Sequence, residues 1–277
     1  MKPNSTSTST STSTSDPLKE RALQLGLHGL VARWAEFHSE PWLERLVSIE
    51  EDARRRRSLE RRIKMARLPR FKAMADFDWT WPKKIDREAV EELFALDFLK
   101  TASNVVLMGP NAVGKSMLSQ NLAYQAVLRG HTAYFVSASD MLNDLARPNT
   151  GVALQRRLHR YLTPQLLVID EVGYLSYDTR HADLLFEIVT RRYEKNSIVL
   201  TTNKPFAEWN QVFPNAACVV TIVDRLVHHA EIIAIEGDSF RNHEAKQRNA
   251  EKAKARLEKR KNRTSTSSNA NTISEAP

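Results

Sequence analysis

Residues 109–116 read GPNAVGKS, and they lie between an apolar run, NVVLM (104–108), and a segment with helical character that begins MLSQNLAYQ. The eight residues match the pattern GxxxxGK(S/T), in which a glycine-rich turn joins a strand to a helix. The backbone N–H groups of such a turn face the ligand, and the start of the helix adds a partial positive charge. This feature predicts a strand–loop–helix unit that binds phosphate groups, and it restricts the chain to α/β folds.

The residues of the loop have separate expected roles. Gly109 and Gly114 allow the backbone to turn, Lys115 would reach the β- and γ-phosphates of a nucleoside triphosphate, and the Ser116 hydroxyl would bind Mg²⁺. The backbone between them would surround the phosphates. The predicted nucleotide-binding residues are Gly109, Pro110, Asn111, Ala112, Val113, Gly114, Lys115, Ser116 and Met117.

Short apolar runs alternate with helical segments around this loop. We predict strands at 104–108, 132–137, 165–170, 197–202 and 231–236, and helices at 115–129, 139–147, 180–195 and 217–229. Strands that are apolar throughout and separated by helices are typical of a parallel sheet covered on both faces. The predicted core is therefore α/β with a five-stranded parallel sheet. The residues after the last strand are mostly polar, so we expect no compact C-terminal helical lid.

Composition divides the rest of the chain into three parts. Residues 1–15 are rich in Ser and Thr and have too little apolar surface to offset the entropy of ordering, so we expect them to be disordered. Residues 16–75 have helical periodicity, interrupted at Pro41, and should form a small basic helical domain. Residues 76–241 hold the core. Residues 242–277 are basic and then polar, and we expect a disordered tail.

Positive charge is concentrated on both sides of the core. Residues 16–75 carry 14 Lys and Arg against 9 Asp and Glu, and residues 241–263 carry 10 against 3, whereas residues 76–240 carry 16 against 20. Such basic segments favour a polyanion such as DNA, although solvated basic faces without a ligand are the alternative. The candidate DNA contacts are Arg54, Arg55, Arg56, Arg57, Arg61, Arg62, Lys64, Arg67, Arg156, Arg157 and Arg160.

Cysteine content and hydropathy restrict the cellular compartments that the protein could occupy. The single cysteine, Cys218, excludes an internal disulfide framework and suits a reducing compartment. No apolar run approaches the roughly 20 residues that cross a bilayer, and the first residues lack the apolar segment of a secretory signal. We therefore expect a cytoplasmic protein with no membrane association.

Polar residues end two of the predicted strands. LLVIDE (166–171) finishes in Asp170, which would hold Mg²⁺, and Glu171, which would orient and deprotonate an attacking water. A base for water favours hydrolysis over transfer to a substrate hydroxyl. Asn203 follows the next strand and is placed to sense the γ-phosphate or the water; by spacing alone, a turn-forming role is the commoner alternative.

The predicted helix at 217–229 carries Arg225, which could act on the γ-phosphate of a neighbouring subunit. The alternative is a surface pair between Asp224 and Arg225. His228 and His229 are adjacent, so on a helix they would point to different faces and make a poor pair of metal ligands.

These motifs together resemble the IstB family, the ATP-binding helper proteins of insertion-sequence transposition. The resemblance extends from about Leu18 to Arg241 and rests on WLERL, RRIKMARLP, FDW, GPNAVGKS, LLVIDEVGYL, LLFEIVTRRYEKNSIVLTTNKPFAEW, VDRLVHHA and GDSFR. It implies a P-loop AAA+ ATPase related to the helicase loader DnaC and the initiator DnaA. It also implies ATP with Mg²⁺ as cofactors, double-stranded DNA and an IstA-type transposase as partners, and self-association with ATP bridging adjacent subunits.

By position, the resemblance makes Lys115 and Ser116 the nucleotide loop, Asp170 and Glu171 the magnesium and water acids, Asn203 the first sensor and Arg225 the finger acting in trans. Many family members have Pro-Gly where this chain has Asn111–Ala112. A second-sensor role for Arg241 stays open. Two other functions are compatible with the loop: a DnaC-like helicase loader, which gene context would distinguish, and a small-molecule kinase, which leaves Glu171 and Arg225 without roles.

Overall fold

The computed structural model describes residues 16–174, 177–214, 216–252, 254 and 256. The chain divides into two compact units, Met1–Arg61 and Arg62–Pro277. The sequence placed a domain boundary near residue 75, and that boundary stays a prediction. The expected disordered segment at 1–15 lies outside the described residues.

The first unit is helical. It contains α1 (Pro17–Gln24), α2 (His28–Ala32), α3 (Trp34–Phe37) and the first part of α4 (Leu43–Ala66). Its buried cluster consists of Ala22, Leu25, Leu43 and Val47. The helical periodicity expected before Pro41 is broken into short helices, because Gly26 takes a φ of 66° and ends α1.

The second unit contains the predicted parallel sheet. Its strands are β1 (Asn104–Met108), β2 (Ala133–Ser137), β3 (Leu166–Val172), β4 (Ser197–Thr202) and β5 (Ala230–Ala234). Their order across the sheet is β2-β3-β4-β1-β5, and every neighbouring pair is parallel. The prediction of five parallel strands is confirmed, and the largest differences in bounds are two residues, at the ends of β3 (expected 165–170) and β5 (expected 231–236).

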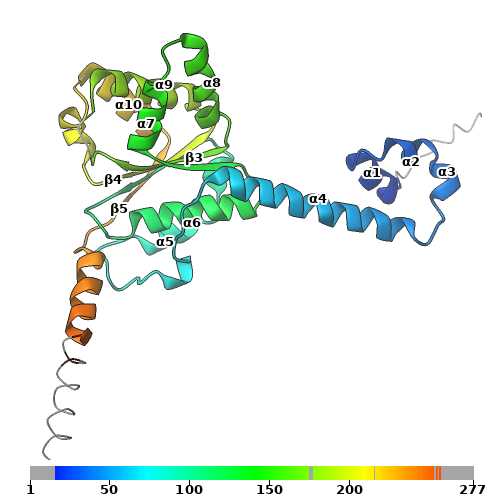
Figure 1. Ribbon diagram of the computed structural model, residues 1–277, viewed down its shortest axis with the longest axis horizontal. Helices are drawn as coiled ribbons and strands as arrows, with labels where there is room; N and C mark the ends of the chain where they lie inside the picture. The colour runs from blue at the N-terminus through cyan, green and yellow to red at the C-terminus, as the bar shows by residue number, and fades with distance from the viewer. Residues whose placement is uncertain (1–15, 175–176, 215, 253, 255, 257–277) are drawn as a thin grey trace, which may run out of the picture. The chain divides into compact units, whose positions relative to one another are not determined.

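Helices cover both faces of this sheet (Figure 1). Helix α6 (Lys115–Leu128) lies on one face, and α7 (Ala138–Ala146), α9 (Thr179–Arg192) and α10 (Ala216–Val227) lie on the other. Because side chains alternate along a strand, Leu167 and Ile169 of β3 join the core beneath α7, α9 and α10. Leu166 and Val168 are equally buried and face α6. This alternation also directs Asp170 toward the α6 face.

Several shorter elements complete the second unit: α5 (Arg87–Leu93), α8 (Gly151–Leu162) and the 3₁₀ turns η1 (Met74–Asp76), η2 (Asp97–Leu99) and η3 (Phe206–Gln211). Neither α5 nor α8 was among the expected helices. Residues 240–252 are also helical, so the expected disorder of 242–277 is wrong for that stretch. Ser239 explains its start, because the Ser239 hydroxyl accepts from the N–H of Asn242. Residues 257–277 lie outside the described part of the chain.

A buried arginine connects the starts of β3 and β4, at the side of the sheet opposite the phosphate loop. Arg192, at the end of α9, is 1% exposed and donates to five backbone carbonyls, those of Tyr161, Leu162, Pro164, Gln165 and Ser197. Burial lowers the pKa of Arg192 to about 9. The guanidinium therefore connects the end of α8 to the starts of two central strands.

The sheet order determines where functional groups can meet. In a parallel sheet all carboxyl ends lie at one edge, and β4 separates β1 from β3. Residues at the end of β4 therefore lie between the loop after β1 and the acids of β3. Within the described residues, no helix is long and apolar enough to cross a membrane.

Candidate nucleotide-binding site

The two glycines of the loop are required by close contacts. A Cβ at Gly109 would lie 2.1 Å from the carbonyl oxygen of Ile235, and one at Gly114 would lie 2.5 Å from a ring carbon of Phe77. Gly114 also has a φ of 106°, which side-chain-bearing residues rarely adopt. The loop is thus packed between the residue that follows β5 and the aromatic segment that precedes the core.

Ala112 is a strained residue within the loop. Its φ is 60°, in the left-handed region where a Cβ costs roughly 1–2 kcal/mol. Its carbonyl accepts a hydrogen bond of 3.0 Å from the N–H of Phe240. The backbone conformation is the one a glycine would adopt freely, so the Asn111–Ala112 pair keeps the loop geometry at an energetic cost.

Lys115 is buried in the loop with only 4% of its surface exposed. Its ammonium donates to the carbonyls of Gly109 and Pro110 at 2.7 and 2.6 Å. Burial lowers the pKa of Lys115 to about 8, although Asp170 and Glu171 oppose that shift. A phosphate placed in the loop would offer this cation a stronger acceptor than two neutral carbonyls.

Asp170 links the loop to the central strands. Its Oδ1 accepts from the Ser116 hydroxyl at 3.0 Å and from the Thr201 hydroxyl at 2.5 Å. Asp170 and Thr201 lie on adjacent strands and face α6, so the parallel sheet brings them together. A hydroxyl and a carboxylate at this distance are an oxygen donor set that suits Mg²⁺.

Glu171 lies on an irregular part of β3. The register between β3 and β4 shifts between Ile169 and Val172, and Glu171 has a φ of 63°. Its N–H donates to the Thr201 hydroxyl at 2.9 Å, which holds the bulge in place. The Glu171 side chain is exposed and lines the pocket beside the loop. A β-bulge therefore turns the second acid away from the core, toward a place where water can reach it.

Asn203 follows β4 and carries an unpaired acceptor. Its Oδ1 is buried and has no hydrogen-bond partner among the described residues. This oxygen lies 3.4 Å from where a Cβ at Gly173 would be, and an orphaned buried acceptor is suited to a ligand or an ordered water. Thr201, two residues earlier, was not identified from the sequence, although it contacts both acids. In the sequence, the one feature that could have pointed to Thr201 is that it is a polar residue near the end of an otherwise apolar strand.

A pocket of about 360 Å³ opens beside the loop. Residues 112–117, Glu171 and Arg241 line it, together with the aromatic side chains of Phe77, Trp81 and Phe240. Trp81 and Phe240 pack edge to face with centroids 5.4 Å apart. The charge of Arg241 contributes to lowering the pKa of Lys115, so Arg241 lies near the phosphate loop. The sequence left the role of Arg241 open and did not identify this aromatic group.

Arg225 is not part of this pocket. Its guanidinium lies 5.3 Å from the ring centroid of Phe186 and 6.0 Å from that of Tyr193, and it donates to the Thr190 hydroxyl. Two aromatic faces thus hold the arginine on the surface formed by α9 and α10.

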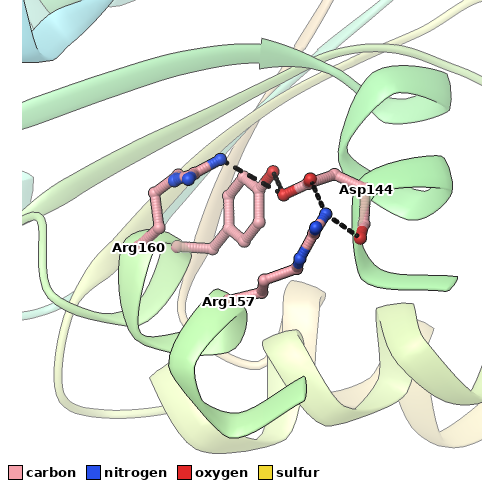
Figure 2. Close-up of polar contacts among 4 residues, drawn as sticks. Asp144, Arg157 and Arg160 are labelled. Carbon is pink, nitrogen blue, oxygen red and sulfur yellow. Dashed lines mark hydrogen bonds and ion pairs between the residues drawn. The ribbon is translucent and has the colours of Figure 1, made fainter. Parts of the chain in front are cut away.

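The candidate DNA contacts differ in how much of their charge is offset. In the first unit Arg54 and Arg57 pair with Glu50, while Arg56 and Arg61 are exposed. In the second unit Arg157 and Arg160 both pair with Asp144, which also accepts from the Tyr161 hydroxyl at 2.8 Å (Figure 2). These two arginines are therefore partly neutralised, whereas Arg156 on the same helix is exposed.

Comparison with known proteins places the chain in a family. A family model described as "IstB-like ATP binding protein" matches residues 21–248. The chain belongs to the IstB-like ATP-binding family. It is 39% identical over 192 residues to an insertion sequence IS21 putative ATP-binding protein of Pseudomonas aeruginosa, covering 69% of this chain and 72% of that one. It is 34% identical over 214 residues to the IS5376 protein of Geobacillus stearothermophilus, covering 76% and 85%.

Solved structures show the same fold. The chain matches DnaI with a TM-score of 0.52 at 17% identity, covering 62% of this chain and 93% of that one. It matches AMPPCP-bound DnaA from Aquifex aeolicus with a TM-score of 0.52 at 22% identity, covering 62% of this chain and 52% of that one. The predicted α/β fold with a five-stranded parallel sheet is confirmed for this IstB-like protein.

Proposed function

We propose that this IstB-like protein is a DNA-dependent ATPase that assists transposition, by capturing target DNA and activating a transposase of the IstA type. The observation that carries the proposal is the hydrogen-bond arrangement around Asp170. One carboxylate oxygen joins Ser116 of the phosphate loop to Thr201, and Glu171 is held beside it by the same threonine. The names of the relatives, which place them in insertion sequences, support the biological context.

Different residues of this chain would have separate roles in ATP hydrolysis. Lys115 would leave its loop carbonyls for the β- and γ-phosphates, and Glu171 would orient the water and take its proton. Asn203 would accept from the attacking water through its unpaired Oδ1, or donate to the γ-phosphate through its amide nitrogen. Mg²⁺, held by Ser116 and Asp170, would supply charge neutralisation on the phosphate oxygens.

Arg225 would complete the site of a neighbouring subunit. It lies outside the pocket of its own chain, and two aromatic rings hold it on the surface. We propose a head-to-tail contact in which ATP lies between Lys115 of one subunit and Arg225 of the next. An arginine supplied in this way is worth about 10³–10⁵ in rate for related phosphoryl-transfer sites.

Mixing two inactive variants tests the shared site. Lys115→Met removes the phosphate contact within a subunit, and Arg225→Ala removes the group supplied to the neighbour. A one-to-one mixture should recover up to about one quarter of the wild-type ATPase rate, since about one interface in four then pairs an intact Lys115 with an intact Arg225. A mixture no more active than the two variants alone would show that Arg225 does not act in trans.

DNA binding has a separate test. The exposed pair Arg56 and Arg61 should contact phosphates, so the Arg56→Ala, Arg61→Ala double variant should lower the slope of log K against log salt by up to about 2. Arg157→Ala is the matched control, because Asp144 already offsets much of that charge. If the double variant and the control bind double-stranded DNA with the same slope, the first unit is not the DNA-binding surface.

A further inference from the structure

Two histidines and a glutamate meet at the far end of α10. His228 and His229 follow the last residue of the helix, Val227, and Glu194 follows the end of α9. One ligand atom from each of the three side chains lies within 4.8 Å of the others. The expectation that the adjacent histidines would point apart is wrong, because the helix ends before them; their ring centroids are only 4.0 Å apart.

We propose that Glu194, His228 and His229 bind one divalent transition-metal ion, and that this ion ties the end of α10 to the end of α9. The three side chains are exposed, so water can fill the remaining coordination positions. Zinc bound by His and Glu has ligand distances of about 2.0–2.2 Å, so the three side chains would move closer together around the ion. Glu194 and His229 already form a contact of 3.5 Å between Oε1 and Nε2.

The surroundings of His228 favour metal binding through one defined atom. Its Nδ1 lies 2.7 Å from the Tyr193 hydroxyl, which leaves Nε2 for an ion. Histidines that bind metals commonly use their second nitrogen in such a hydrogen bond, which fixes the ring and the tautomer. Tyr193 thus supplies the orienting contact that a pair of solvated histidines would lack.

The donor set also selects the class of metal. Two imidazole nitrogens and one carboxylate suit Zn²⁺, Co²⁺, Ni²⁺ and Cu²⁺, whereas Mg²⁺ prefers oxygen ligands. The site therefore differs in chemistry from the hydroxyl and carboxylate pair of Ser116 and Asp170. Millimolar Mg²⁺ should not compete with a transition metal at the histidines.

The position of the site gives the ion a structural consequence. Tyr193 contacts His228 through its hydroxyl and also lies under the guanidinium of Arg225. An ion bound to His228 and Glu194 would link the residue after Tyr193 in the chain to the histidine that contacts the Tyr193 hydroxyl. The ion would thereby restrain the last turn of α10, which carries Arg225. Metal binding itself does not depend on the proposed trans role of Arg225, so the two proposals can fail separately.

The test is metal titration of the full-length, tag-free chain after removal of ions with a chelator. Calorimetry with Zn²⁺ in excess Mg²⁺ should give one ion per chain, and Co²⁺ should produce the visible absorption of a nitrogen-containing site. His229→Ala and Glu194→Gln should each weaken binding by at least about tenfold. His159→Ala, which removes an exposed histidine of α8, should leave affinity and stoichiometry unchanged.

Hydrogen exchange tests the structural consequence. Zn²⁺ at a concentration that just saturates the wild type should slow amide exchange at residues 190–195 and 225–230 in the wild type and in His159→Ala, and slow it much less in Glu194→Gln because that variant binds the ion more weakly. The proposal is overturned if the wild type binds no stoichiometric ion. It is also overturned if His159→Ala weakens binding as much as His229→Ala, because zinc would then be held by scattered surface histidines.

Discussion

Replacing Thr201 with valine should uncouple the two acids from the central sheet. Thr201 is fully buried, its hydroxyl donates to Asp170 at 2.5 Å, and it accepts from the N–H of Glu171 at 2.9 Å. Valine has nearly the same shape, so the change removes two hydrogen bonds with little change in packing. A bond to a charged group contributes about 1.5–3 kcal/mol and a neutral one about 1 kcal/mol, which predicts a loss of about 2.5–4 kcal/mol in stability.

The effect on hydrolysis should exceed what lower stability explains. Without the Thr201 hydroxyl, Asp170 keeps its bond from Ser116 but loses its bond from the neighbouring strand, and the bulge that presents Glu171 loses the hydrogen bond from the Glu171 N–H. Groups that orient metal ligands typically change metal affinity or activity by 10- to 100-fold, so kcat should fall by about that factor. Binding of a fluorescent ATP analogue through the loop should change much less.

Thr202→Val is the matched control for this prediction. Thr202 is equally buried on the same strand, but its hydroxyl bonds the backbone of Lys204 instead of the acids. Both variants should lose stability in urea denaturation, and only Thr201→Val should lose hydrolysis measured with saturating DNA well below its unfolding transition. A kcat for Thr201→Val within about twofold of that for Thr202→Val would refute the positioning role.

Three further substitutions test the site and its support by urea denaturation. Burial lowers the pKa of Lys115 from 10.5 to about 8, so keeping this side chain charged in the folded state costs free energy below pH 8. Lys115→Met should therefore raise the free energy of unfolding by up to about 3 kcal/mol at pH 7, and this gain should shrink as the pH rises from 8 toward 10.5. A difference in stability that does not change with pH would contradict this prediction. Ala112→Gly should stabilise the protein by roughly 0.5–1 kcal/mol by relieving a φ of 60°, while a loss would show that the loop is not strained. Arg192→Met should lower the free energy of unfolding by about 3 kcal/mol or more, because five carbonyls lose their donor. Arg192→Lys keeps a cation that can donate to some of them and should lose less; equal losses in the two variants would show that a retained positive charge does not replace the guanidinium.

The sequence was sufficient wherever the fold depends on a local pattern. The parallel strands and the loop between β1 and α6 follow from residues that are adjacent in the chain, and the structure contains them. The roles of Asp170 and Glu171 stay predictions. Thr201 could not be found in this way. Its contact with Asp170 depends on which strands are neighbours in the sheet, and the order β2-β3-β4-β1-β5 is not encoded by the period of any single strand.

The error over His228 and His229 has a similar physical origin. Helical periodicity is strong within α10, but a helix end is decided by a few backbone contacts, and these are poorly specified by propensity. The predicted helix at 217–229 would separate the two rings by about 100° around the helix axis. In the structure α10 ends at Val227, and the two rings approach each other. An error of two residues at a helix end thus reversed the interpretation of a possible metal site.

Strain and charge in the loop suggest how nucleotide binding would act on the proposed self-association. Lys115 donates to Gly109 and Pro110, and Ala112, held in a strained conformation, accepts from Phe240. A phosphate that draws Lys115 away must therefore disturb the same loop that contacts Phe240, which begins the helical residues 240–252 and packs on Trp81. Trp81 and Phe240, which line the pocket, should consequently change position when the γ-phosphate binds, before any contact with a neighbouring subunit is made. Trp81 fluorescence that changes with an ATP analogue at protein concentrations too low for self-association would support this order, and a change only after assembly would reverse it.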